Sequence, residues 1–206
     1  MPRAIGQIDQ AKSEAMLDAA GAVISERGLG APVETIARRA GVSKQTLYNH
    51  YGGKEGLIRA LVRRRVDQMT APLSDTDHYE RPEAALAAFA QALMEAILSP
   101  MSLAVMRVAI HGALDMPDMA QTFYEAGPMT TRVRLAAFLR AETEAGRLAV
   151  DDPAYAAELF GAMVSSRQIR ALLGLAVPGD ADTVQRLSRT IAHRFVRAYA
   201  PDIAEA

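Results

Sequence analysis

The chain has 206 residues, of which 50% are apolar, and this is enough to bury a large core in one or two domains. It contains no cysteine, which excludes a disulfide scaffold, a thiolate zinc site and a cysteine nucleophile. The charge is unevenly distributed: residues 1–70 carry 11 Lys and Arg against 7 Asp and Glu, whereas residues 71–206 carry 12 against 17. A basic first third on an acidic body indicates that any polyanionic partner binds to the N-terminal part.

The sequence also bears on targeting. Its first residues, MPRAIGQIDQAKSE, lack the apolar core of a secretory signal, and we expect a cytoplasmic protein. The most membrane-like stretch, 84–106, is interrupted by Glu95, Ser99 and Pro100, whereas a spanning helix needs about 20 apolar residues. We interpret this stretch as two buried helices in tandem and expect no contact with a membrane.

Apolar residues recur at three- and four-residue spacing and no segment alternates with period two, so the sequence predicts an all-α fold. The predicted N-terminal helices are one that ends near Gly28, one over 33–40, one over 44–50 and one from Lys54 to just before Pro72. The segment 73–82 is polar and rich in turn-forming residues, which predicts a loop and a domain boundary.

Beyond this loop, prolines stand where first helical turns are expected, because proline lacks the N–H that a first turn leaves unbonded. The predicted helices are 82–98, 100–114, a short one from Pro117, one from Pro128 to before Gly146, a long one over 153–174 and a last one over 181–199. The expected organisation is a three-helix domain over 1–53 with a helix-turn-helix at about 33–51, a connecting helix over 54–71 and a larger helical body over 82–206.

The most informative segment is ETIARRAGVSKQTLYNHY, residues 34–51. Ile36, Ala37 and Ala40 are expected to face inward, and Gly41 supplies a sharp turn. Val42 and Leu47 fill the space between the two helices, and Ser43 is a good N-cap for the second one. This pattern leaves six residues for the outer surface: Lys44, Gln45, Thr46, Tyr48, Asn49 and His50.

The outward residues suit contact with DNA. The amides of Gln45 and Asn49 are able to pair with a base edge, most naturally that of adenine. Lys44, Thr46, Tyr48 and His50 carry ammonium, hydroxyl and imidazole groups, which are able to donate hydrogen bonds to phosphate oxygens. Lys54 begins the next helix, where unbonded N–H groups and the helix dipole also favour a phosphate. The alternative is a plain corner of two helices whose polar residues merely face water.

Residues 12–61, with LDAA, ERG and IARRAGVSKQTLYNHYGGKEGLIRAL in order, resemble the DNA-binding domain of the TetR family. The resemblance implies a recognition helix over Ser43–His50. It implies base contacts by Lys44, Gln45 and Tyr48, and phosphate contacts by Thr46, His50 and Lys54. Two positions depart from the family pattern. Ala31, followed by Pro32 at the first helical position, replaces the usual Thr or Ser cap, and Gln45 replaces a common Gly.

The C-terminal part, with AVMRVAIHGALDMPDMAQTFYEAGP and AAFLRAETEAGRLAVDDPAYAAELFGAMV, resembles the AefR-like subgroup. The resemblance implies a homodimer and an effector pocket, and the Met- and aromatic-rich composition favours a small, mostly apolar effector. The candidate pocket residues are Met94, Leu98, Met101, Met106, Arg107, His111, Phe123, Tyr124 and Phe138. The candidate dimer residues are Leu159, Phe160, Met163, Leu172, Leu173, Leu187 and Ile191. For each of these residues, ordinary core packing is the simpler interpretation, and Arg107 is able to pair with Asp115 or Glu125.

Together with these resemblances, the sequence predicts a transcriptional regulator of the repressor type, a homodimer that binds a palindromic double-stranded operator and that a ligand releases from DNA. The alternative is the same DNA reader with a ligand-free body, acting as an architectural or protein-regulated factor. An enzyme is disfavoured, because the four histidines belong to no recognised catalytic motif and Asp75, Asp77 and His78 lie in a predicted loop. We expect no cofactor and no metal ion.

Overall fold

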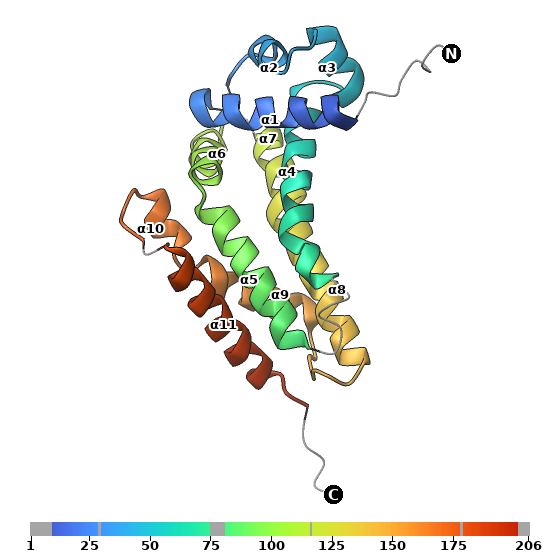
Figure 1. The fold of residues 1–206 in the computed structure, drawn as a ribbon, viewed down its shortest axis with the longest axis vertical. Helices are drawn as coiled ribbons and strands as arrows, with labels where there is room; N and C mark the ends of the chain where they lie inside the picture. Colours follow the sequence, from blue (N-terminus) through green and yellow to red (C-terminus); the bar gives the residue numbers. More distant parts are fainter. Residues whose placement is uncertain (1–9, 29, 75–80, 116, 178, 202–206) are drawn as a thin grey trace, which may run out of the picture. The chain divides into compact units, whose positions relative to one another are not determined.

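The computed structural model describes residues 10–28, 30–74, 81–115, 117–177 and 179–201 (Figure 1). All regular structure in these ranges is helical, which confirms the predicted all-α class. The elements are α1 (Gln10–Arg27), α2 (Val33–Arg39), α3 (Lys44–Tyr51), α4 (Lys54–Thr70), the 3-10 turn η1 (Ala71–Leu73), α5 (Pro82–Leu98), α6 (Pro100–His111), α7 (Pro117–Tyr124), the π-helical turn η3 (Glu125–Met129), α8 (Thr130–Glu144), α9 (Pro153–Ser165), α10 (Gln168–Leu172) and α11 (Ala181–Ala198).

The helices group into two compact units. The first, called the N-terminal unit below, comprises the described residues up to Arg64 together with those of 100–126, and the second, called the body unit, comprises the described residues of 65–99 and from Gly127 onward. The chain therefore crosses between the units inside α4, between α5 and α6, and inside η3. The functional division into 1–53, 54–71 and 82–206 stays a prediction, and the packing places α6 and α7 with the N-terminal helices.

The N-terminal unit has a core of its own. Met16, Ile36, Leu47 and Leu57 are fully buried there, with Ala109 of α6 in the same cluster. Gly21 lets α6 approach α1 closely, because an added Cβ would lie 3.0 Å from the sulfur of Met101. This close approach explains why α6 packs with helices that precede it by some 80 residues in the printed sequence.

The core of the body unit is built around α5, which lies beside α11 (Figure 1). The rings of Phe89 and Phe160 stack with centroids 5.9 Å apart, and Phe195 meets Phe160 edge to face at 5.0 Å. Both geometries are favourable for aromatic pairs. Phe89 and Phe160 have no exposed surface, so the contacts join α5, α9 and α11 in one interior.

Three predicted helix boundaries are wrong. The helix expected over 153–174 is interrupted after Ser165, at two adjacent serines, which favour a helix less than alanine or leucine does, and α10 follows separately. Pro128 does not open α8 but lies inside η3, and regular α-helical bonding resumes at Thr130. The helix from Pro100 ends at His111 rather than at residue 114.

The start of α2 also differs from expectation. Pro32, with φ −63° and ψ 141°, is the N-cap, and Val33 is the first helical residue. No side chain caps this helix, and the N–H of Thr35 donates to the Pro32 carbonyl at 3.0 Å. The fixed φ of proline thus replaces a capping hydroxyl.

None of the described helices is by itself long and apolar enough to cross a membrane. Only α5 and α6 taken together reach the required length and composition, and they are separate helices joined at Ser99. The buried side chains of α5 include Leu86, Phe89 and Leu93, which lie in the core of the body unit.

The turn between α2 and α3 depends on Gly41. Its φ of 67° lies in the left-handed region, and it allows the N–H of Val42 to donate to the Ala37 carbonyl at 3.0 Å. Gly161 is a contrasting case, because it lies inside α9 and an added Cβ would meet nothing within 4 Å.

The same substitution should therefore have opposite effects at these two glycines. Gly41→Ala should lower the free energy of unfolding by about 1–2 kcal/mol, the cost of left-handed backbone for an L-residue. Gly161→Ala should raise it by up to about 1 kcal/mol through helix propensity. Thermal and urea unfolding followed by circular dichroism measure both changes, and a shift of the same sign in both variants would contradict this account.

Candidate nucleic-acid interface

α3 is oriented by its two ends and by one buried side chain. At its start, the Thr46 N–H donates to Ser43 Oγ at 3.0 Å, and the two hydroxyl oxygens lie 2.8 Å apart, so the predicted cap is present. At its end, Gly52 has φ 73° and closes the helix through its N–H to the Tyr48 carbonyl. Leu47 has no exposed surface, which fixes the inner face and turns the opposite face to solvent.

The two amides proposed to bind bases are bonded to each other. The Gln45 Nε2 donates to Asn49 Oδ1 at 2.7 Å, and both side chains are exposed. The bond leaves an amide acceptor on Gln45 and amide donors on Asn49, which are the two kinds of group that pair with the major-groove edge of adenine. The spacing of four residues on one helix face makes this pair possible.

Lys44 is held at the start of α3 by two neighbours. Its Nζ lies 2.5 Å from Glu34 Oε1 of α2 and 5.5 Å from the centre of the Tyr48 ring. The hydrogen bond between the two groups raises the pKa of Lys44 and lowers the pKa of Glu34. Both groups are therefore charged at neutral pH. Tyr48 itself is 40% exposed, as its predicted role requires.

The C-terminal end of α3 is tied to α1 through Ser13. The Tyr51 hydroxyl donates to the Ser13 carbonyl at 3.3 Å and lies 3.0 Å from Ser13 Oγ. His50 Nε2 lies 3.4 Å from the same Oγ, and the ring remains exposed. Sequence reasoning missed Ser13 and Tyr51, because a contact between residues 37 or 38 positions apart follows only from the crossing of the two helices.

Lys54 begins α4, as predicted, after the glycine pair Gly52 and Gly53 with φ values of 73° and 129°. The side chain is partly buried, and this burial lowers the pKa of Lys54. A phosphate at this position would offset the loss of hydration and restore the preference for the charged form. Thr46 is half-buried, and its hydroxyl is already engaged with Ser43.

The predicted DNA-contacting residues thus lie on one short helix and on the start of the next. The N-terminal N–H groups of α3, two exposed amides, an aromatic hydroxyl and a lysine offer the donors and acceptors that a major groove and its flanking phosphates require. Glu34 is the exception, because a carboxylate at this edge repels phosphate. Among the described residues, no group of three or more His, Asp or Glu could hold a metal ion. Asp75, Asp77 and His78 lie outside the described residues.

The candidate pocket residues are divided between the two units. Met94 is 3% exposed in the core of the body unit, and Leu98 and Phe138 pack against that core. Six others belong to the N-terminal unit, where Phe123 packs against the core: they are Met101, Met106, Arg107, His111, Phe123 and Tyr124. Arg107 and His111 are exposed on α6. The pocket formed by these residues stays a prediction.

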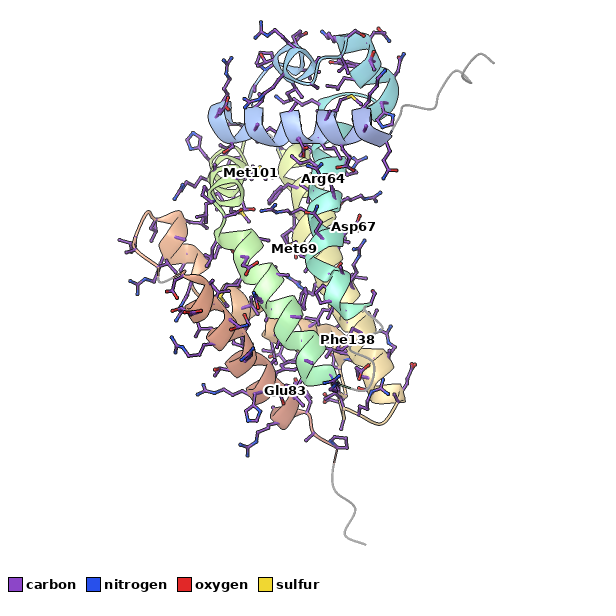
Figure 2. The ribbon with its side chains drawn as sticks, in the orientation of Figure 1. Arg64, Asp67, Met69, Glu83, Met101 and Phe138 are labelled. Atoms are coloured by element: carbon purple, nitrogen blue, oxygen red, sulfur yellow. The ribbon has the colours of Figure 1, made fainter. Side chains whose placement is uncertain are left out.

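The body unit has a groove at a different place. It has a volume of about 600 Å³ and follows α5 and α11, with Glu83, Ala87 and Gln91 on one side and Gln185, Arg189 and Val196 on the other. Glu83, labelled in Figure 2, also lies 3.3 Å from His193 Nδ1 of α11. None of the candidate pocket residues lines this groove.

The candidate dimer residues divide into buried and exposed positions. Phe160 has no exposed surface, and Met163, Leu187 and Ile191 pack against the core of their own chain. Leu159 and Leu173 are 39% and 70% exposed, and Leu172 is half-buried. The exposed pair is therefore the part of the set that remains free to meet a second chain.

The fold is shared with solved regulators. A TetR-family transcriptional regulator from Mesorhizobium loti aligns over 94% of this chain and 100% of its own, with a TM-score of 0.77 and 23% identity, which shows the fold alone. The flavonoid-responsive regulator FrrA aligns over 94% of this chain and 100% of its own, with a TM-score of 0.69 and 28% identity.

Two curated relatives are similar over part of the chain. The transcriptional repressor KstR2 of Mycobacterium tuberculosis is 35% identical over 99 residues, which are 47% of this chain and 49% of KstR2. The transcriptional activator FasR of Mycolicibacterium smegmatis is 39% identical over 80 residues, 36% of each chain. The chain thus spans about half the length, or less, of the curated relatives that it matches.

Two family descriptions match the sequence. Residues 16–61 match the bacterial regulatory proteins of the tetR family, and residues 84–201 match the C-terminal domain of AefR-like transcriptional repressors. Both descriptions concern transcription regulators, which are not enzymes, so the enzymatic alternative is removed. The C-terminal match alone covers more than half of the chain, and the chain therefore belongs to the TetR family, with a C-terminal domain of the AefR-like repressor type.

Proposed function

We propose that this protein is a sequence-specific DNA-binding repressor that binds a palindromic double-stranded operator as a homodimer. The observation that carries the proposal is the exposed face of α3, where Gln45 and Asn49 form an ordered amide pair beside Lys44 and Tyr48. A helix of eight residues that begins with a satisfied N-cap is able to enter a major groove with its N-terminal half. The AefR-like repressor match and the similarity to KstR2 favour repression over activation.

Exposed apolar residues of the body unit support the homodimer. Tyr155 and Leu159 lie one helical turn apart on α9 and are 58% and 39% exposed. Ile169 lies in α10 and Leu173 directly follows this helix, and their side chains are 62% and 70% exposed. Large apolar side chains gathered on consecutive helices are typical of an interaction surface, and two half-sites of DNA are read by a symmetric pair of chains.

We propose further that a small, mostly apolar molecule releases the protein from DNA. FrrA, which has the same fold and 28% identity, is described as flavonoid-responsive, so flavonoids are a suitable first class of probe. An effector changes DNA affinity only if it prefers one conformation over another. Such a preference needs a physical route between the units, and the chain provides three covalent crossings, one of them inside α4.

Arginine bridges hold α4 on both sides of its crossing. In the N-terminal unit, Arg64, which is labelled in Figure 2, donates to Glu14 Oε2 at 2.6 Å and to Asp18 Oδ1 at 2.8 Å, both on α1. In the body unit, Arg134 of α8 donates to Asp67 Oδ1 at 2.5 Å and to Thr70 Oγ1 at 2.8 Å. A shift of α8 would thus be transmitted to the last turns of α4.

The second candidate function is that of an architectural or protein-regulated DNA-binding factor, whose body unit binds no ligand. It is supported by the burial of Met94, which is 3% exposed, and by the packing of Leu98 and Phe138 on the same core. A filled interior leaves an effector without a cavity unless the core opens. The two candidates differ in whether any small molecule stabilises the protein.

Substitutions on α3 and α4 should separate base contacts from phosphate contacts. Gln45→Ala should weaken binding to the duplex that the native protein selects from a randomised library by about 1–3 kcal/mol and relax specificity at one position. Lys54→Ala should weaken binding to duplexes of every base sequence by the same factor. It should also reduce the slope of log affinity against log salt by about 0.9. Fluorescence anisotropy at several salt concentrations measures both effects. Unchanged affinity and base preference in Gln45→Ala would show that Gln45 only faces solvent.

Charge at an exposed apolar position should separate the two chains without unfolding them. Leu173→Asp should yield a folded monomer, because a buried unpaired charge at an interface costs several kcal/mol. Leu114→Asp, at a leucine of the N-terminal unit that is 95% exposed, is the matched control and should remain dimeric. Phe160→Asp should instead unfold the chain, since Phe160 lies in its core. Analytical ultracentrifugation and circular dichroism distinguish these results, and a monomeric native protein at micromolar concentration contradicts the homodimer.

A panel of flavonoids tests ligand release. At least one member should raise the melting temperature of the protein and dissociate the selected duplex, and Arg134→Gln should keep the stabilisation while reducing the dissociation, because α8 would no longer hold α4. Glu158→Gln removes the weaker pair between Arg132 and Glu158, at 3.7 Å, and serves as control. Absence of any stabilising member would favour the ligand-free alternative.

A further inference from the structure

Glu34 forms an ion pair with Lys44 at the edge of the surface that we propose to meet DNA phosphates. Glu34 lies in the first turn of α2 and Lys44 is the first residue of α3. Their side chains are 56% and 53% exposed, and the Nζ to Oε1 distance is 2.5 Å. The hydrogen bond keeps the pKa of Glu34 low and that of Lys44 high, so the pair persists across the neutral range.

The position of Lys44 explains what the carboxylate does. The N-terminus of a helix carries a partial positive charge, and a lysine there is unfavourable unless an anion lies nearby. In the free protein Glu34 is that anion, because its carboxylate meets the ammonium at the start of α3. A DNA phosphate, like the Glu34 carboxylate, is an anion that a helix N-terminus attracts and that accepts hydrogen bonds from nearby donors. In the free protein, the Glu34 carboxylate therefore supplies the negative charge beside Lys44 that a DNA phosphate would supply in a complex.

We propose that Glu34 is an intramolecular competitor of DNA phosphate for Lys44, and that it limits the affinity of the protein for DNA. This inference rests on the proposed DNA-binding function. When a duplex approaches, Lys44 exchanges the carboxylate for a phosphate, and the ionised Glu34 is left close to the phosphate backbone. Both the lost ion pair and the repulsion oppose binding, on any duplex, and the base contacts of α3 must exceed this cost.

The competition predicts a gain on substitution. Glu34→Gln keeps the shape of the side chain and removes its charge. The variant should bind both the duplex selected by the native protein and a shuffled duplex of the same composition about threefold to tenfold more tightly. The slope of log affinity against log salt should steepen by up to about 0.9, because the variant presents one more unit of net positive charge to the phosphates than the native protein does.

Two comparisons show whether the gain acts through Lys44. Glu26→Gln is the matched control, because Glu26 is 53% exposed, pairs with Arg39 at 2.6 Å in the same unit and changes the net charge equally. It should give a smaller gain than Glu34→Gln. In a Lys44→Met background, Glu34→Gln should lose most of its effect on affinity and on the salt slope.

The experiment measures anisotropy with both duplexes, together with the salt concentration at which each variant elutes from heparin. Unchanged or weaker binding by Glu34→Gln overturns the proposal, as does an equal gain in the Lys44→Met background or in Glu26→Gln. The heparin measurement does not depend on an operator. If the native protein selects no duplex but Glu34→Gln elutes at higher salt in a Lys44-dependent manner, the proposed function fails and the competition for Lys44 stands.

Discussion

The burial of Leu47 is the constraint on which the candidate interface depends. α3 has only eight residues, and Leu47 is the one among them that is fully enclosed in the core of the N-terminal unit. Because a helix has 3.6 residues per turn, fixing one residue inward fixes the direction of all the others. Gln45 and Asn49 are thereby placed on the outer face. Gly41 and the Ser43 cap then set where α3 begins, so the exposed face is determined by packing rather than by the polar residues themselves.

The polar side chains of this face are partnered before any ligand arrives. Gln45 is bonded to Asn49, Lys44 to Glu34, and Ser43 to Thr46. These bonds order the side chains and reduce the conformational entropy that binding would otherwise remove. They also have to be exchanged or adapted when a duplex binds, and the charged pair resists this exchange more than the neutral ones. The same contacts therefore organise the surface and moderate its affinity.

The two units are linked by covalent continuity at three places, and α4 is the crossing with the clearest anchoring. Arg64 binds two carboxylates of α1, and three residues later Asp67 accepts from Arg134 of α8. Each bridge is partly exposed and singly contributes about 0–1 kcal/mol. Their importance lies in geometry, because a bidentate guanidinium restricts how the helix slides or rotates within its unit.

The sequence by itself determined the helical class, most helix starts and most of the outward residues of α3, because proline, glycine and capping residues act locally and the apolar spacing of a helix is regular. It failed where local signals compete: at Pro128, which lies in a π-helical turn, and after Ser165, where α9 ends. The partners of the site were decided only by tertiary structure. The pair of Glu34 with Lys44, the contact of Ser13 with Tyr51 and the packing of α6 on Gly21 each join residues from different helices. Their encounter depends on how the helices cross, and helix crossing is set by the packing of whole faces rather than by any single residue.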